Sequence, residues 1–286
     1  MTTMMNKPLA VAERQIELDR FMSTVAQASS SALLLDYDGT LAPFSTDRKQ
    51  ATPYRGVTAL LQEIMVSGKT RVVIITGRSA AEVISLLGID PSPEVWGSHG
   101  FERLRPNGTC EVPRVGPDAL QALSEAGRWL ADQGFQHLTE FKPGGIAVHW
   151  RELSESSAAD VRESVLRVWF PIAQRTRLSV LEFDGGVEIR VAGLDKGDAV
   201  RTVIQEMYLD APIAYMGDDA TDEQAFAAID SRGLSILVRP KWRRTFARLW
   251  LKPPDDLLDF LTRWRKSCCR PNAKSEVDLL PRIGEL

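Results

Sequence analysis

Short apolar runs that stop at polar, glycine-containing segments recur along the chain. They occupy residues 32–35, 71–75, 95–96, 213–216 and 234–238. Runs of this length that end in a turn are typical of buried parallel strands. Helical patterns lie before and between them, as at residues 11–27 and 80–87. Strands that alternate with helices predict an α/β core in which helices cover both faces of a parallel sheet.

The middle of the chain has a different rhythm. Helical patterns at residues 118–133 and 154–170 are each followed by two alternating runs, which are 136–142 with 146–151 and 179–183 with 187–191. Alternation on either side of a glycine-rich turn predicts a β-hairpin. We therefore expect an inserted α+β domain, an antiparallel sheet backed by helices, at residues 114–192. The core then consists of residues 1–113 and 193–265, and residues 266–286 form a flexible C-terminal tail.

Composition narrows the class of protein. The 286 residues are enough for two domains, and a formal net charge of −3 gives no electrostatic footprint for nucleic acid. No apolar run approaches the length of a membrane span, and the first residues lack the apolar region of a secretory signal. The three cysteines form neither a disulfide framework nor a spaced metal motif. We expect a cytoplasmic protein, and the sequence leaves open whether it is a monomer or a weak dimer.

The first strand runs directly into Asp36-Tyr37-Asp38-Gly39-Thr40. Two carboxylates so close together repel each other, and a divalent cation such as Mg2+ would remove that cost. A carboxylate is also a competent nucleophile toward phosphorus, and a second one can protonate the leaving alcohol. The alternative is a plain Asx turn, which the dipeptide spacing by itself favours.

Other strand ends favour the catalytic interpretation. Asp218, Asp219, Asp222 and Glu223 crowd into one short segment, which is more acidic than a helix cap requires. Lys196 precedes a predicted helix and could bind phosphate as a point charge, although a solvated surface lysine is the ordinary alternative. Thr76 could donate its hydroxyl to phosphate, with Gly77 allowing close backbone approach, or it could simply cap a helix.

These residues resemble the four motifs of the haloacid dehalogenase superfamily of phosphotransferases, in order along the chain. The sequence is similar in particular to the trehalose-6-phosphate phosphatases over residues 31–261. The matching segments are 35–43, 76–78, 97–102, 140–142, 149–151, 188–190, 195–197 and 217–223. Two mild departures are Thr76, where that family often has serine, and Ser98, at a variable position.

The resemblance implies a Rossmann-like core of the haloacid dehalogenase type with an inserted α+β cap domain. It implies Asp36 as nucleophile, Asp38 as general acid/base and backbone-carbonyl metal ligand, and Thr76 with Lys196 on phosphate. Mg2+ would be the cofactor, held by Asp36, Asp38 and Asp218 with Asp222 close by. The implied reaction is hydrolysis of trehalose 6-phosphate, a small-molecule sugar phosphate, in the last step of trehalose biosynthesis.

The cap is where we expect the sugar to be recognised. By the two-residue period of a strand, Glu140 shares a face with Lys142, His149 with Arg151, and Glu188 with Arg190. Such mixed polar side chains suit sugar hydroxyls, although they could also be the solvated face of the sheet. We predict that these six cap residues bind the substrate together with three residues of the core, Gly77, Arg78 and His99.

Three alternatives remain at this point. A phosphatase of sucrose phosphate, a glycosyl-glycerate phosphate or a hexose phosphate would share the core, and only the cap residues argue against it. A phosphosugar mutase of the same superfamily would share Asp36 and Asp38. A non-catalytic sugar-phosphate sensor would be expected to have lost Asp36, Lys196 or Asp218, and all three are present.

Overall fold

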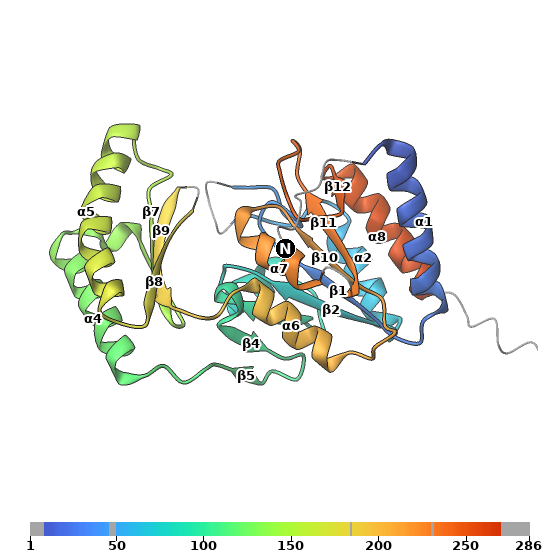
Figure 1. Ribbon diagram of the computed structural model, residues 1–286, viewed down its shortest axis with the longest axis horizontal. Helices are drawn as coiled ribbons and strands as arrows, with labels where there is room; N and C mark the ends of the chain where they lie inside the picture. The colour runs from blue at the N-terminus through green and yellow to red at the C-terminus, as the bar shows by residue number, and fades with distance from the viewer. Residues whose placement is uncertain (1–8, 46–49, 184, 230–231, 270–286) are drawn as a thin grey trace, which may run out of the picture.

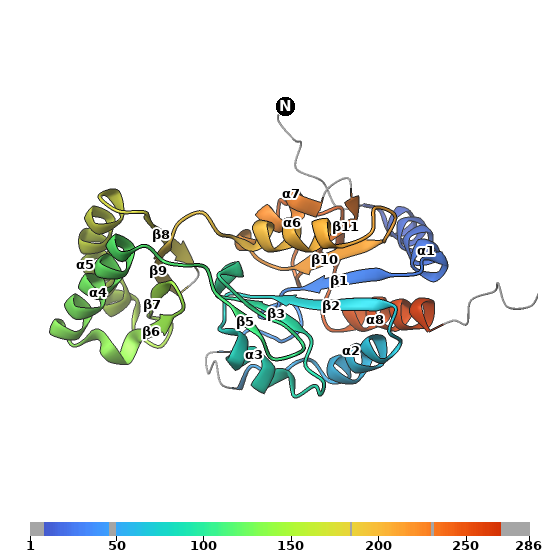
Figure 2. The same cartoon turned by 90° about the horizontal axis from the view of Figure 1, so that it is seen from below.

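The structure is a computed structural model that describes residues 9–45, 50–183, 185–229 and 232–269. The protein has two lobes, each with its own β-sheet, and two connecting segments join them (Figures 1 and 2). The chain crosses from one lobe to the other between Glu111 and Pro117, and returns between Val191 and Lys196. We call the smaller lobe the cap, and we propose residues 114–192 as its limits.

The larger sheet has eight strands in the order β12-β11-β10-β1-β2-β3-β4-β5. Their bounds are Ser31–Leu35 (β1), Thr70–Ile75 (β2), Glu94–Gly97 (β3), Glu102–Leu104 (β4), Cys110–Glu111 (β5), Ile213–Gly217 (β10), Leu234–Val238 (β11) and Leu249–Leu251 (β12). The six from β12 to β3 pair in parallel, and β4 and β5 extend the edge antiparallel. All five predicted core strands are therefore present, and β4, β5 and β12 are additions.

Helices cover both faces of this sheet (Figure 2). One face carries α1 (Val11–Gln27), α2 (Val57–Val66), α3 (Ala80–Leu87) and α8 (Asp255–Cys268), and the other carries α6 (Lys196–Glu206) and α7 (Glu223–Ile229). Successive residues of β1 serve opposite faces: Leu33 and Leu35 pack with the first set and Leu34 with the second. A strand buried on both faces must be apolar throughout, which explains why its run ends abruptly at Asp36.

The cap sheet has four antiparallel strands in the order β6-β7-β9-β8. They are β6 (Thr139–Lys142), β7 (Gly145–His149), β8 (Leu178–Phe183) and β9 (Gly186–Val191). Helices α4 (Pro117–Asp132) and α5 (Glu155–Gln174) cover the face turned away from the larger sheet (Figure 1). Ala126, Val165 and Trp169 from these helices pack with Val148 and Ile189 in the cap core. The open face of the cap sheet is thus turned toward the carboxyl ends of the core strands.

Four predicted boundaries are wrong. The first cap strand begins at Thr139, because Phe135–Leu138 forms a 3-10 turn, and β7 ends at His149, so that Arg151 lies in the following turn. Helix α5 continues through Pro171 to Gln174, since Trp169 and Ile172 are buried in the cap core. The predicted tail begins too early, because α8 runs to Cys268. The rest of that tail, from residue 270, lies outside the described residues.

Among the described helices, none has the combined length and apolar character that crossing a bilayer requires.

Candidate active site

Asp36 is the first residue beyond β1, and its position follows from the parallel ladder. Its backbone N–H donates to the carbonyl of Met216 at 2.8 Å, so the chain ends of β1 and β10 stay in register. The side chain is buried, with 4% of the residue exposed. The hydroxyl of Thr40 donates to Asp36 Oδ2 at 3.3 Å. The other carboxylate oxygen accepts from a lysine that is distant in sequence.

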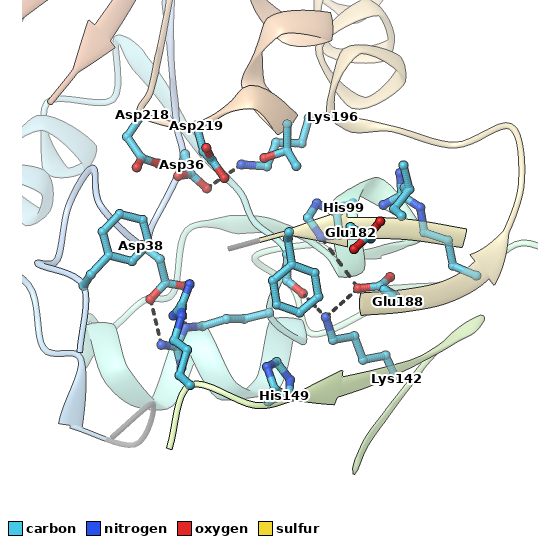
Figure 3. Close-up of a pocket in the computed structure, with 18 of the residues that line it drawn as sticks. Asp36, Asp38, His99, Lys142, His149, Glu182, Glu188, Lys196, Asp218 and Asp219 are labelled. Carbon is cyan, nitrogen blue, oxygen red and sulfur yellow. Dashed lines mark hydrogen bonds and ion pairs between the residues drawn. The ribbon is translucent and has the colours of Figure 1, made fainter. Parts of the chain in front are cut away.

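That lysine is Lys196, the first residue of α6. Its Nζ lies 2.7 Å from Asp36 Oδ1 (Figure 3). It also lies 2.7 Å from Asp222 Oδ1, and the lysine is almost fully buried. Its two acidic partners raise the pKa of Lys196 far above its ordinary value, against the lowering effect of burial. The ammonium is therefore permanently charged and joins the loops after β1 and β10.

Asp222 forms hydrogen bonds that hold the loop after β10, which carries Asp218 and Asp219. Its Oδ1 accepts from Lys196 and, at 2.5 Å, from the hydroxyl of Tyr215. Its Oδ2 accepts from the backbone N–H groups of Asp218 and Asp219 at 3.0 and 2.9 Å. Both oxygens are thus engaged twice, and the residue has no exposed surface. These contacts suit a structural support for the loop better than a direct ligand.

Asp218 lies beside Asp36 and is open to the pocket. Its carboxylate receives no hydrogen bond from any residue that the structure describes. Gly39 has a φ of +78°, and a Cβ there would lie 2.3 Å from Asp218 Oδ2, so only glycine fits between the two loops. Burial, followed by the charges of Asp36 and Asp222, raises the pKa of Asp218 well above its ordinary value. Burial also raises the pKa of Asp36 to about 7, despite the opposing effect of Lys196.

This donor set fits a divalent cation. Asp36, Asp218 and Asp222 place one carboxylate oxygen each within 4.8 Å of one another. Three carboxylates against the single ammonium of Lys196 leave a net charge of two negatives in a buried cluster, which is costly without a counter-charge. Mg2+ takes oxygen ligands and commonly uses one or two carboxylates together with substrate phosphate. Asp36 and Asp218 both line the pocket, and Asp222 supports the loop that carries Asp218.

Asp38, two residues beyond Asp36, is held by a different group. Arg78 donates from Nε to Asp38 Oδ2 and from Nη2 to Asp38 Oδ1, both at 2.7 Å, and a third nitrogen contacts Glu82. Arg78, which was predicted to bind substrate, lines the pocket, and its guanidinium is bonded to these two carboxylates. The sequence did not reveal this pairing, because Asp38 and Arg78 stand forty residues apart.

One pocket joins the strand ends to the open face of the cap. It is lined by twelve of the fifteen predicted site residues, namely Asp36, Asp38, Gly77, Arg78, His99, Lys142, His149, Arg151, Glu188, Arg190, Lys196 and Asp218. The other three do not line it. Thr76 is buried and accepts the N–H of Arg78 on its hydroxyl at 3.2 Å, Asp222 lies under the loop, and Glu140 pairs with His149 at 2.8 Å.

The cap and the core touch through the polar residues of this pocket. Lys142 Nζ donates to Glu188 at 2.9 Å and to the core carbonyl of Gly77 at 3.0 Å (Figure 3). His99 Nε2 lies 3.8 Å from Glu188 Oε2. Burial, followed by the charges of Lys142, Arg190 and Lys196, lowers the pKa of His99 well below its ordinary value, so the imidazole is neutral. A neutral ring can accept as well as donate a hydrogen bond.

Several residues of this pocket were missed in the sequence. Phe44 and Ser45 come from the core loop after Thr40, and Leu181, Glu182 and Phe183 come from β8. The guanidinium carbon of Arg151 lies 5.6 Å from the centre of the Phe44 ring, and His149 packs against Phe183 with ring centres 5.4 Å apart. Phe44 and Leu181 are exposed apolar side chains, a property that only the structure reveals, so the sequence carried no signal for them.

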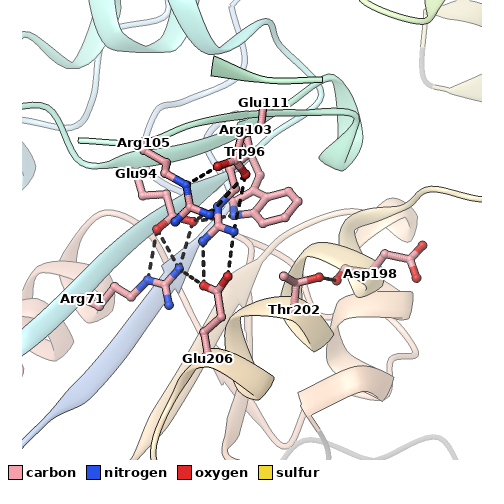
Figure 4. A network of polar contacts seen from close by, with 9 residues as sticks. All are labelled: Arg71, Glu94, Trp96, Arg103, Arg105, Glu111, Asp198, Thr202 and Glu206. Atoms are coloured by element: carbon pink, nitrogen blue, oxygen red, sulfur yellow. Dashed lines mark hydrogen bonds and ion pairs between the residues drawn. The ribbon is translucent and has the colours of Figure 1, made fainter. Parts of the chain in front are cut away.

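Helix α6 carries Lys196 at its first residue and is anchored at its last. Glu206 accepts from Arg71 at 2.6 Å and from Arg103 at 2.8 and 2.6 Å (Figure 4). Both arginines also donate to Glu94 on β3. Arg103 and Glu94 are buried, and a buried ion pair that loses one partner is strongly destabilising. This network attaches α6, and with it Lys196, to the sheet edge from which the chain enters the cap.

Comparison with known proteins identifies the family. The trehalose-phosphatase family model matches residues 34–245. A trehalose-phosphate phosphatase of Mycobacterium marinum is 33% identical over 81% of this chain and 60% of its own length. The chain thus spans about 60% of that relative.

Solved structures share the fold. The C-terminal domain of a C. albicans trehalose-6-phosphate phosphatase superposes with a TM-score of 0.74 at 18% identity, over 92% of this chain and 99% of that one. A protein described as related to trehalose-6-phosphate phosphatase gives a TM-score of 0.64 at 26% identity, over 83% and 97%. The predicted fold class, a haloacid dehalogenase-type α/β core with an α+β cap, is confirmed. With its residues 34–245 matched, this chain belongs to the trehalose-phosphatase family.

Proposed function

We propose that this chain is a Mg2+-dependent phosphatase that hydrolyses trehalose 6-phosphate to trehalose and inorganic phosphate. The proposal rests on the position of Lys196, whose Nζ lies 2.7 Å from a carboxylate oxygen of Asp36 and 2.7 Å from one of Asp222. These groups lie at the base of a pocket lined by polar cap residues. A carboxylate beside a fixed ammonium at the end of a strand is suited to attack a phosphate that the ammonium also attracts.

In the first step Asp36 attacks phosphorus, and the bond from phosphorus to the sugar oxygen breaks. Asp38 donates a proton to the departing oxygen, which leaves the phosphoryl group on Asp36. In the second step the Asp38 carboxylate takes a proton from water as the water attacks phosphorus, and Asp36 is released with inorganic phosphate. Lys196 counters the negative charge that gathers on the phosphoryl oxygens in both steps.

Mg2+ would be held by the Asp36 and Asp218 carboxylates, with the Asp38 backbone carbonyl as the predicted third ligand. Bound there, it would supply positive charge to the phosphate oxygens and orient the phosphoryl group. The raised pKa values of Asp36 and Asp218 support this proposal, because each carboxylate needs a nearby positive charge to stay ionised.

The cap would recognise the sugar. Glu188, Lys142, His149 and Arg190 offer both donors and acceptors to hydroxyl groups. Phe44, Leu181 and Phe183 offer apolar surface on the same pocket, which suits the C–H faces of a pyranose ring. A disaccharide presents both kinds of surface.

The test is phosphate release from a panel of sugar phosphates, with and without Mg2+. The panel includes trehalose 6-phosphate, sucrose 6-phosphate, glucosylglycerate phosphate and glucose 6-phosphate. We expect the highest kcat/KM with trehalose 6-phosphate and no turnover in excess EDTA. A higher kcat/KM for another sugar phosphate would keep the phosphatase and replace the substrate. Conversion of a hexose phosphate to an isomer without phosphate release would favour a mutase, and binding without any reaction would favour a sensor.

A further inference from the structure

The loop that carries Asp218 is held from two sides. Asp222 accepts the N–H groups of residues 218 and 219, at 3.0 and 2.9 Å. On the opposite side Arg243 donates to the carbonyl groups of the same two residues, from Nε to Asp218 at 3.2 Å and from Nη2 to Asp219 at 2.6 Å. Every backbone polar group of these two residues is therefore bonded. Arg239 adds a longer contact to the Asp218 carbonyl, at 3.3 Å.

Arg243 is itself fixed by Glu223, the residue that follows Asp222. Glu223 Oε1 accepts from Arg243 Nη1, and Oε2 accepts from the backbone N–H of Phe246 at 2.8 Å and from the Thr245 hydroxyl at 3.3 Å. The side chains of Arg243 and Glu223 are 23% and 17% exposed, so the pair is largely shielded from water. The segment 243–246 is thus attached to the start of α7 and presents the guanidinium to the loop.

We infer that Arg243 is a positioning residue for the Mg2+ site, and that it acts by fixing the peptide units from which the Asp218 side chain projects. The inference rests on the Mg2+ site of the proposed function. Nothing in the acidic segment itself requires an arginine, and Arg243 lies twenty residues after its last member, Glu223. Removal of a group that orients a metal ligand typically costs about 10–100-fold in metal affinity.

Arg243 could influence Mg2+ binding through its charge or through its hydrogen bonds, and these two effects would change the affinity for Mg2+ in opposite directions. If the guanidinium mattered only as a positive charge near the site, its removal would tighten Mg2+ binding, since like charges repel. If it matters as a two-pronged donor that holds the loop, removal weakens binding. Lysine keeps the charge but cannot reproduce the planar fork, so Arg243→Lys separates the two effects.

The experiment is a Mg2+ titration of the full chain, followed by the rise in Tm, for the unaltered protein, Arg243→Ala, Arg243→Lys and Glu223→Gln. We expect the apparent Kd for Mg2+ to rise about 10–100-fold in Arg243→Ala and by smaller factors in the other two. Phosphatase activity of Arg243→Ala should recover at saturating Mg2+. Arg232→Ala is the matched control, because Arg232 also donates to two carbonyls, those of Tyr208 and Leu209, on a loop outside the pocket.

The outcomes are distinguishable. An unchanged or lower Kd in Arg243→Ala, or an equal rise in Arg232→Ala, overturns the inference and leaves the Mg2+ site standing. If the unaltered chain shows no Mg2+-dependent rise in Tm, the proposed metal site fails, and the inference fails with it. If Arg243→Ala does not fold, Arg243→Lys and Glu223→Gln decide the question by the same measurement.

Discussion

Arg78 forms a bidentate ion pair with Asp38, in which each carboxylate oxygen accepts a hydrogen bond from a different guanidinium nitrogen at 2.7 Å. The Asp38 side chain is 29% exposed, whereas that of Arg78 is 4% exposed, so the carboxylate faces the pocket from a buried base. The nearby Asp36 bonds to Lys196 instead. The two carboxylates of the same loop are thereby directed by different cations, which suits two different chemical roles.

Asp38→Asn should separate the two steps of the reaction. With p-nitrophenyl phosphate the leaving group needs no proton, so Asp36 should still be phosphorylated. Water is then activated poorly, so we expect a burst of p-nitrophenol equal to the amount of enzyme, followed by slow turnover. With trehalose 6-phosphate the rate should fall about 10²–10⁴-fold. Steady turnover of both substrates at the unaltered rate would refute the acid/base role. Arg78→Lys, which keeps the charge and loses the two-pronged contact, should give a milder form of the same defect.

Asp36→Asn keeps the size of the side chain and removes the nucleophile. Turnover of any phosphate ester should fall by several orders of magnitude, which is within the range that enzymes supply. Circular dichroism and Tm would show that the fold survives. Appreciable phosphate release by a correctly folded, freshly purified variant would mean that another group attacks phosphorus.

Stability without Mg2+ should depend on pH in a direction set by Asp36 and Asp218, because the pKa values of both carboxyl groups are raised. Burial raises the pKa of Asp36 from 3.8 to about 7, so between these values the folded chain binds more protons than the unfolded chain. The stabilisation from the protonated form is fully present below about pH 4 and is lost as the pH rises through 7. Because Mg2+ binds the ionised form, the rise in Tm that it causes should be larger at pH 8 than at pH 5. In Asp36→Asn this difference should shrink, and a difference that does not shrink would assign the titration to another group.

Glu188→Gln should impair use of the sugar substrate selectively. Glu188 is 3% exposed and bonds to Lys142 at 2.9 Å within the pocket. Loss of a hydrogen bond to a charged group costs about 1.5–3 kcal/mol, so kcat/KM for trehalose 6-phosphate should fall about tenfold to hundredfold. Hydrolysis of p-nitrophenyl phosphate should change little. Glu140→Gln is the matched comparison and should have a smaller effect, because Glu140 does not line the pocket and reaches it only through His149 and Lys142. Equal losses on both substrates would indicate folding or cap closure.

The strand ends could be predicted because their signals are local. An apolar run such as residues 32–35 must be buried on both faces, and parallel strands end at one edge of the sheet. Asp36, Lys196 and Asp218 were therefore expected to meet, and in the structure they do. The cap hairpins were visible for a similar reason, because alternation about Gly144-Gly145 and Gly185-Gly186 is a local pattern.

Tertiary structure alone decided which side chain each charged group serves. The pairing of Arg78 with Asp38 was not predicted, nor were the four hydrogen bonds by which Asp222, expected at the metal site, supports the loop. Arg243 carried no signal, since the carbonyls of Asp218 and Asp219 and the carboxylate of Glu223 that it contacts are at least twenty residues away in sequence. The spacing of residues in the sequence determines which groups share a strand or a helix turn. The partner of a long side chain depends instead on which groups lie within its reach in the folded molecule. That arrangement exists only once the sheet, the helices and the cap are packed together.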